Sequence, residues 1–323
     1  MKKLAVIILA LALAMTVLAG CGESKDKNVK IAIIKIVEHP SLDTIETSTI
    51  AQLEALGYKN GENAVISAFS AQGDPSNVAA IMDSLVADGT NLVIAITTPV
   101  AMVALNYAEQ IPLIFSAVSN PIEAKLTSSL EHPDKNVTGT CDAVPVESII
   151  DFVLQTVPGA KKAGFIYNPG EASSVANIDS AKAYCDSKGI SYVEASISSS
   201  TEIAQSAQAL AQCDFVFTPT DNTVAEGMAA LAQVCIDAKV PCFVGADSMV
   251  KDGGLATIGI KYEDLGIETA NMAKQVLDGV KISDIPVKVF TDLSTYINLS
   301  TAEKIGVTFD ESVLSNSKTV IFE

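Results

Sequence analysis

Short apolar runs alternate with longer segments of helical periodicity along most of this chain. Runs such as Val29–Ile36, Asn91–Ile96 and Lys162–Tyr167 are apolar almost throughout, and each is followed by a segment whose apolar residues recur at helical spacing. Strands of this kind, interleaved with helices, are typical of a parallel sheet that is covered on both faces. The pattern therefore predicts an α/β fold built from βα units.

Two such series follow each other, at residues 29–140 and 146–247, and each has enough strands for a sheet of its own. The remainder holds one predicted strand (Gly254–Ile260), one helix (Leu265–Leu277) and a strand-like segment (Val287–Asn298), which is too little for a third domain. We therefore expect two Rossmann-like lobes with parallel sheets, joined by a hinge of several crossings near residues 140–144, 256–261 and 279–285. The expected lobes are 29–142 plus 256–279, and 143–255 plus 280–323.

The N-terminus has the organisation of an export signal. Met1–Lys3 is basic, residues 4–18 are continuously apolar, and Leu18-Ala19-Gly20-Cys21 follows. A basic start, a short apolar core and small residues before a break are typical of a secretory signal peptide. The position of Cys21 resembles a bacterial lipobox, which predicts a signal peptide at 1–20, lipidation of Cys21, a tether at 21–28 and a body at the extracytoplasmic face of the cell membrane. The alternative is an ordinary signal peptide with a chance cysteine.

Charge excludes two classes of partner. The chain has 38 acidic residues against 21 basic ones, for a formal net charge of −17. Nucleic acids and anionic lipid surfaces both need a basic protein face, so neither is expected as a partner, and membrane contact is expected through the lipid anchor only. All the basic residues are lysines. Without a guanidinium group, an acidic ligand has to be held by lysine, hydroxyl groups or backbone N–H groups.

Enzyme, cofactor and metal signals are weak. The sequence has no GxSxG elbow, no phosphate-binding loop and no GxGxxG fingerprint, and only two histidines. The five later cysteines have no metal-type spacing, so we expect no metal and no cofactor. An exported protein can form disulfides, but buried free thiols are the favoured interpretation of these cysteines. They are Cys141, Cys185, Cys213, Cys235 and Cys242.

Polar residues gather in the loops that follow the predicted strands. In open parallel sheets, ligands bind beyond the carboxyl ends of the strands, so these loops are the candidate site. Most of the loops also precede helices, whose free N–H groups favour an anion. The candidate ligand-binding residues are His39, Gln72, Asp74, Thr97, Thr98, Ser119, Asn120, Tyr167, Glu171, Ser173, Ser174, Asp221, Asn222 and Asp247.

Each of these residues also has a purely structural interpretation. Asp74-Pro75, Thr98-Pro99 and Asn120-Pro121 all have the form of helix caps, with proline at the start of a helix. Taken singly, such residues are more often caps than ligand contacts. The functional prediction rests on their repetition at one end of both sheets.

Several segments together resemble a known family. They are EHPSLD at 38–43, AQGD at 71–74, TP at 98–99, AVSNP at 117–121, NVTGT at 136–140, PTDN at 219–222 and YEDLG at 262–266. The chain is similar to the substrate-binding proteins of bacterial ABC importers, and to the tryptophan- and tyrosine-binding lipoproteins of Gram-positive bacteria in particular. The resemblance implies a periplasmic-binding-protein type I fold that closes on its ligand by hinge motion. It also implies delivery of the ligand to a permease driven by a separate ATPase, and for several members an aromatic amino acid as ligand.

The resulting hypothesis is a monomeric, lipid-anchored receptor, not an enzyme, which binds an aromatic amino acid between its lobes. We expect Thr97, Thr98 and Ser119 to hold the α-carboxylate, and Asp221 to meet the ammonium group. Asn222 or Asp247 would support Asp221, and Tyr167 would form part of an apolar wall. The alternatives are a receptor for a branched-chain amino acid or a nucleoside, a sensory co-receptor, and an exported enzyme on the same two lobes.

Overall fold

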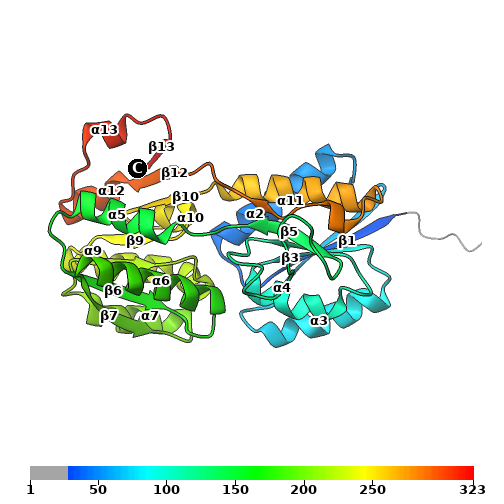
Figure 1. The fold of residues 1–323 in the computed structure, drawn as a ribbon, viewed down its shortest axis with the longest axis horizontal. Coiled ribbons are helices and arrows are strands. Elements are labelled where there is room, and N and C mark those ends of the chain that lie inside the picture. The colour runs from blue at the N-terminus through cyan, green and yellow to red at the C-terminus, as the bar shows by residue number, and fades with distance from the viewer. Residues whose placement is uncertain (1–27) are drawn as a thin grey trace, which may run out of the picture.

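The computed structural model describes residues 28–323, which fold into two α/β lobes lying side by side (Figure 1). The first lobe is built on a six-stranded sheet with the order β11-β5-β4-β3-β1-β2, and all of its neighbouring strands are parallel. Its strands are β1 (Val29–Lys35), β2 (Ala64–Ser70), β3 (Leu92–Ile96), β4 (Leu113–Ser116), β5 (Val137–Cys141) and β11 (Lys288–Val289).

Helices cover this first sheet, and two of them are packed closely together. The helices are α2 (Pro40–Ala55), α3 (Pro75–Ala87), α4 (Thr98–Ala104), the 3-10 turn η1 (Leu105–Tyr107) and α11 (Tyr262–Leu277). Helices α2 and α11 lie side by side although they are far apart in sequence (Figure 1). A Cβ atom at Gly266 would lie 2.6 Å from the carbonyl oxygen of Ile45, so only glycine permits this approach.

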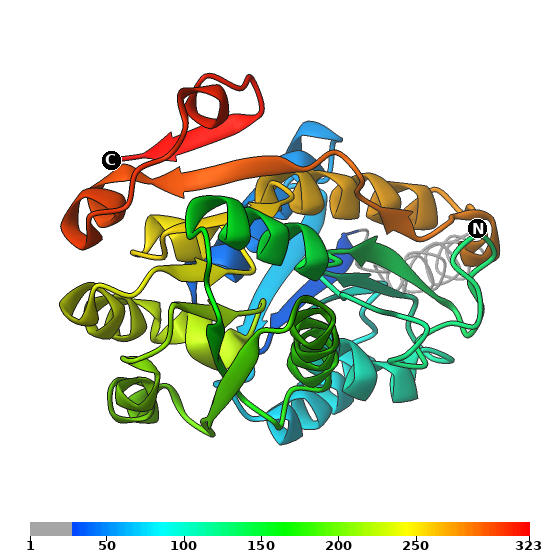
Figure 2. The same cartoon turned by 60° about the vertical axis from the view of Figure 1, so that its left-hand side comes forward.

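The second lobe has a seven-stranded sheet with the order β13-β12-β10-β9-β8-β6-β7. Its strands are β6 (Lys162–Tyr167), β7 (Ser191–Ser196), β8 (Phe215–Thr218), β9 (Cys242–Val244), β10 (Ala256–Gly259), β12 (Ser294–Asn298) and β13 (Thr319–Phe322). Strands β10 and β12 pair antiparallel, so this sheet is mixed where we expected a parallel one. Figure 2 shows β13 beside β12 at the outer edge of the lobe.

Helices and 3-10 turns of different lengths surround the second sheet. They are α5 (Val146–Thr156), α6 (Ala172–Lys188), η2 (Ser200–Glu202), α7 (Ile203–Ser206), η3 (Ala207–Leu210), α8 (Asn222–Glu226), α9 (Met228–Ala238), α10 (Asp247–Lys251), α12 (Leu299–Ile305) and α13 (Glu311–Leu314). Helices α8 and α9 follow each other along the chain and are separated at Gly227. A Cβ atom there would lie 2.5 Å from Cδ1 of Ile203, so close packing against α7 accompanies the break.

The chain crosses between the lobes after β5, after β10 and after β11. Two expected boundaries differ from this arrangement. Strand β10, expected in the first lobe, pairs with β9 and β12 of the second sheet. Strand β11, expected in the second lobe, adds to the edge of the first sheet beside β5. The third crossing therefore lies between Val289 and Ser294 and not at 279–285, where the 3-10 turn η4 (Ile282–Asp284) leads into β11.

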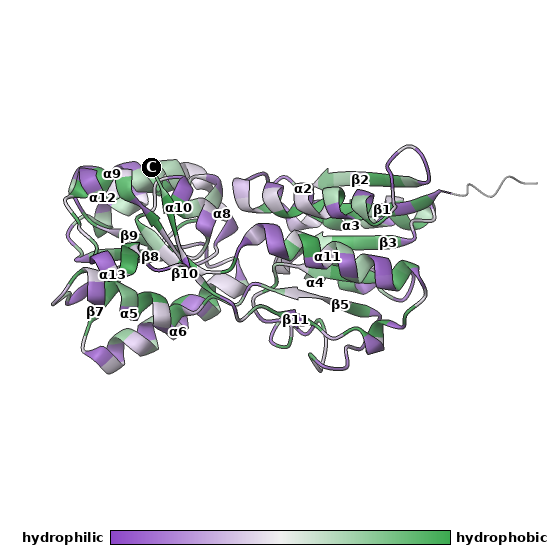
Figure 3. Cartoon of the chain, turned by 90° about the horizontal axis from the view of Figure 1, so that it is seen from above, coloured by the Kyte–Doolittle hydropathy of each residue, from purple (hydrophilic) through white to green (hydrophobic). Residues whose placement is uncertain are grey.

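Buried apolar residues form two clusters around the sheets. One includes residues of the first sheet together with Ile166 and Val216 of the second, and the other is built around Phe165 and Phe217 of the second sheet. Figure 3 shows hydrophobic colouring along β2 and β3, while the helices around them carry both polar and apolar residues. The five described cysteines are buried and free, as predicted. Within residues 28–323, no helix is long and apolar enough to span a membrane. The predicted signal peptide, Cys21 and most of the tether lie outside the described residues.

Candidate functional site

The two lobes enclose a small polar cavity at the carboxyl ends of their strands. Its volume is about 20 Å³, which is enough for a water molecule or one small polar group. Both lobes contribute to its wall. The lining residues are His39, Ser41, Leu42, Thr97, Thr98, Ala117, Ser119, Asp142, Ser173, Thr220, Asp221, Asn222, Ala225, Ala246, Met249 and Tyr262.

The backbone of the first lobe is strained where it reaches this cavity. Thr97 follows β3 with φ 86° and ψ 155°, a region that residues with side chains rarely adopt, and Ala117 follows β4 with φ 54°. Thr97 precedes α4 but its side chain does not cap the helix, and its buried Oγ1 has no hydrogen-bond partner among the described residues. The strain therefore holds an unused hydroxyl group at the wall of the cavity.

Two polar contacts join the lobes directly. Nε2 of His39, which begins α2, lies 3.3 Å from Oδ1 of Asn222 in the second lobe. The hydroxyl groups of Ser41 and Ser248 form a second contact between the lobes. Burial lowers the pKa of His39 to about 4, so the ring is neutral at pH 7 and donates from Nε2 to Asn222. The lobes are in contact across the cavity.

Asn222 connects this contact to two carboxylates of the second lobe. Its side-chain Nδ2 donates to Glu171 over 2.5 Å, and Glu171 also accepts from the backbone N–H of Thr223 over 3.1 Å. Asp221 accepts from the backbone N–H groups of Asn168 (2.7 Å) and Val224 (2.9 Å), and so caps α8. Burial and the neighbouring Asp221 raise the pKa of Glu171 to about 8, and burial raises that of Asp221 as well.

A third carboxylate lies at the first crossing between the lobes. Asp142 follows β5 directly, and its side chain accepts from the hydroxyl of Ser119 (2.9 Å) and from that of Tyr262 (3.0 Å). Tyr262 is the first residue of α11, just after the second crossing. Burial raises the pKa of Asp142 to about 6, despite both hydrogen bonds. One carboxylate therefore joins two crossings to a loop of the cavity wall.

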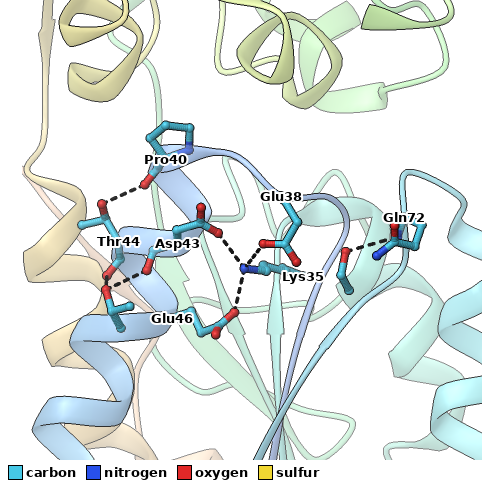
Figure 4. A network of polar contacts seen from close by, with 9 residues as sticks. Lys35, Glu38, Pro40, Asp43, Thr44, Glu46 and Gln72 are labelled. Atoms are coloured by element: carbon cyan, nitrogen blue, oxygen red, sulfur yellow. Dashed lines mark hydrogen bonds and ion pairs between the residues drawn. The ribbon is translucent and has the colours of Figure 1, made fainter.

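Lysine does not supply a free cation at the end of β1. The ammonium group of Lys35 forms ion pairs with Glu38 (2.5 Å), Asp43 (2.6 Å) and Glu46 (2.9 Å), as Figure 4 shows. Because all three carboxylates belong to the first lobe, the buried ammonium group of Lys35 is fully paired within that lobe. Among residues 28–323, no group of His, Cys, Asp and Glu side chains is placed to hold a metal ion.

Two larger cavities border the small one. One of about 220 Å³ shares Thr98, Ser119 and Ser173 with it and continues between the loop after β4, the first crossing and α6. The other, of about 210 Å³, shares Asn222 and is bordered by Gly73 and Glu171. The first of these has apolar walls, among them Met102, Ala124, Val144, Ala172 and Ala176.

Half of the predicted site residues line the small cavity: His39, Thr97, Thr98, Ser119, Ser173, Asp221 and Asn222. Asn120 and Glu171 border the larger cavities instead. Gln72 and Asp74 lie on the loop after β2, where Asp74 caps α3 through the backbone N–H of Ser76. Ser174 is buried in α6. Asp247 is the first residue of α10, and its carboxylate accepts from the backbone N–H of Ser248 over 2.8 Å.

Tyr167 is not part of the cavity wall. It belongs to the core beneath α6, and its hydroxyl donates to Glu194 of β7 over 2.8 Å. Side chains alternate between the two faces of a strand, so the last residue of β6 can face the sheet-covering helix as readily as the cleft.

Sequence reasoning missed two of the most connected residues, Asp142 and Tyr262. Asp142 follows a strand, β5, that the sequence analysis did not predict, because its residues 137–141 are mostly small and polar. Tyr262 stands in the YEDLG segment at the start of a predicted helix, so a signal for it was present. The lining residues Ser41, Leu42, Met249 and Ala246 were also not predicted.

Comparison with known proteins fits this two-lobed architecture. The model of a family described as ABC transporter substrate binding protein matches residues 30–321. The chain belongs to this family. A tyrosine-binding protein of Clostridioides difficile is 35% identical over 320 residues, which cover 95% of this chain and 93% of that protein.

Solved structures of relatives indicate the arrangement of the lobes. A Streptococcus pneumoniae ABC domain in complex with L-Trp is 34% identical, with a TM-score of 0.86 over 91% of this chain and 100% of that one. A ligand-free, open substrate-binding protein of Clostridium difficile has the same identity and covers 91% of this chain and 99% of its own. Its TM-score is only 0.69. The two relatives have the same sequence identity to this chain and almost the same coverage, so the difference in TM-score reflects the arrangement of the lobes. The lobes here are arranged more like those of the L-Trp complex.

Proposed function

We propose that this protein is the extracytoplasmic receptor of an ABC importer for an aromatic amino acid. The observation that carries the proposal is a small cavity between the lobes that shares Thr98, Ser119 and Ser173 with a half-apolar cavity of about 220 Å³. Ligand sites of this kind combine apolar walls with a few polar groups that fix orientation. The likeness to a tyrosine-binding protein and to a complex with L-Trp supports the same ligand class.

In this proposal the charged end of the amino acid lies where the small cavity adjoins the larger one, and the aromatic ring occupies the larger one. The hydroxyl groups of Thr97 and Thr98 and the start of α2 at Ser41 are the donors for the α-carboxylate. The carboxylates of the cavity wall bind the ammonium group, and Asp221 is the one that we expect from the sequence to do so. The ring lies between Met102 of α4 and Ala176 of α6.

The anchor and the partners follow from the sequence and the family. Lipidation at Cys21 would hold the body at the outer face of the membrane through the tether at 21–28. The permease of the importer and its ATPase are the expected partners, and a single copy suffices because both halves of the cavity come from one chain. Binding and release by lobe closure, without catalysis, complete the proposed cycle.

A thermal-shift screen of residues 28–323 tests the ligand class. L-tyrosine, L-tryptophan and L-phenylalanine are compared with branched-chain amino acids and purine nucleosides. A ligand at 100 times its dissociation constant stabilises the folded protein by about 2.7 kcal/mol, which is a visible shift of Tm.

A shift with aromatic amino acids alone is the expected result. A shift only with branched-chain amino acids or nucleosides would contradict the ligand assignment and keep the receptor. Turnover of a bound ligand, followed by mass spectrometry, would contradict the receptor class itself. Denatured protein should first be examined for ligand retained through purification.

A further inference from the structure

Asp142 is a buried carboxylate of the cavity wall whose negative charge has no cationic partner. It is 5% exposed, and it lines the small cavity. None of the ion pairs within residues 28–323 includes it. Buried charges in proteins are paired in most cases, because an unpaired one costs several kcal/mol. Among the described residues, the charge of Asp142 therefore has no compensating positive charge.

The neighbours of Asp142 favour a cation in the same place. The hydroxyl protons of Ser119 and Tyr262 both point to the carboxylate, at 2.9 Å and 3.0 Å. A hydroxyl group has one proton and two lone pairs, so the oxygen of Ser119 can now only accept. Ser119, predicted to donate to the ligand carboxylate, thus forms an acceptor pair with Asp142 and would repel that carboxylate.

Asp221 is the rival for the same role, and its bonding differs. Its two carboxylate oxygens already accept from the backbone N–H groups of Asn168 and Val224. Glu171, beside it, accepts from the side chain of Asn222 and from Thr223. Backbone N–H groups donate to both Asp221 and Glu171 in the second lobe, whereas the side-chain donors to Asp142 are two hydroxyl groups.

We propose that Asp142, with the oxygen of Ser119, takes the ammonium group of the bound amino acid. The inference rests on the proposed function and deepens it, because it assigns the charge that selects an amino acid over a simple acid. Since Asp142 stands at the first crossing and contacts Tyr262 at the second, the ligand would bind against the hinge itself. The donors at Thr97 and Thr98 then receive the carboxylate on the other side of the cavity.

The test is a comparison of two ligands on four proteins by titration calorimetry. The ligands are L-tyrosine and 3-(4-hydroxyphenyl)propanoate, which lacks the ammonium group. The proteins are the unaltered chain, Asp142→Asn, the rival Asp221→Asn, and Asp292→Asn as a control in an exposed carboxylate. Asp142→Asn should weaken L-tyrosine at least 100-fold and leave the deaminated acid within about threefold. Asp221→Asn should keep most of the preference for L-tyrosine.

Two outcomes would overturn the inference. One is an unchanged preference for L-tyrosine in Asp142→Asn; the other is loss of that preference in Asp221→Asn alone. In either case the unaltered protein still binds, so the proposed function survives. Failure of the unaltered chain to bind any aromatic amino acid overturns both. If Asp142→Asn does not fold, Asp142→Glu keeps the charge but moves it, and should weaken only L-tyrosine, at least tenfold.

Discussion

Nε2 of His39 lies 3.3 Å from Oδ1 of Asn222, and this contact joins the two lobes across the cavity. His39 begins α2 of the first lobe, while Asn222 begins α8 of the second. The Nδ2 group of Asn222 donates a hydrogen bond to Glu171, and this leaves the Oδ1 atom of Asn222 facing the histidine ring. The His39 ring therefore makes this hydrogen bond only when the second lobe lies against the first.

We predict that His39→Ala weakens ligand binding about fivefold, because the closed state loses one hydrogen bond of about 1 kcal/mol. Titration calorimetry with the ligand from the screen measures the change. His132→Ala is the matched control, since His132 is an exposed loop residue of the first lobe. Equal affinity of both variants would show that the His39 contact does not stabilise closure.

The strained backbone at Thr97 predicts that two substitutions there weaken binding equally but differ in stability. Thr97→Gly and Thr97→Ala both remove the unpartnered hydroxyl group, so both should weaken ligand binding by about tenfold. Only glycine adopts φ 86° without strain, so Thr97→Gly should be more stable than Thr97→Ala by about 1 kcal/mol. Urea denaturation of the two variants measures this difference. A less stable glycine variant would contradict the strained backbone.

The raised pKa of Glu171 predicts that stability falls as the pH rises from 6 to 8. Burial and Asp221 raise the pKa of its carboxyl to about 8, above the ordinary value near 4.5 that applies to the unfolded chain. As the pH rises, Glu171 therefore loses its proton in the unfolded chain before it does so in the folded protein. The stabilisation that comes from the protonated carboxyl group is lost progressively between pH 4.5 and about pH 8. We expect the unfolding free energy to fall by about 2 kcal/mol between pH 6 and pH 8.

The control for this prediction is Glu171→Gln, which cannot ionise. Denaturation in urea at pH 6 and pH 8 should show a smaller difference for the variant than for the unaltered chain. An equal pH dependence in both proteins would assign the titration to another group, among which Asp142 and Asp247 have pKa values of about 6.

The contact between α2 and α11 predicts a severe effect at one glycine. The Cβ atom of Gly266→Ala would lie 2.0 Å from Oγ of Ser48 and 2.6 Å from the backbone oxygen of Ile45. Since backbone atoms cannot move aside cheaply, we expect a loss of about 2 kcal/mol or more. Gly259→Ala is the control, because its nearest neighbour would be 3.8 Å away. Thermal denaturation that ranks the two variants equally would contradict the close approach.

Much of the fold could be predicted because local patterns encode it. Runs such as Lys162–Tyr167 are apolar at successive positions, and the strand found there has the same bounds. The pattern fails at β5, because a strand of small and polar residues lacks a clear apolar signal. The strand-like segment 287–298 contains two strands, β11 and β12, which belong to different sheets, so the third crossing between them was misplaced.

The candidate site was predictable to the extent that topology alone brings residues together. Thr97 and Asn222 both come after strands that pair in parallel with their neighbours, and parallel strands place such loops at one edge. Which face a side chain takes was not predictable. Tyr167 ends β6 and Asp74 lies in the loop after β2, but Tyr167 packs beneath α6 and Asp74 caps α3.

The sequence by itself determined the βα alternation, the two lobes and the polar loops at one end of each sheet, because helical and strand periodicity are local properties of a chain. Only the tertiary structure decided that Asp142 meets Ser119 and Tyr262, which are 23 and 120 residues away in the sequence. Such contacts depend on how the three crossings bring the lobes together. The free energy of that arrangement comes from packing between distant segments, which no local pattern records.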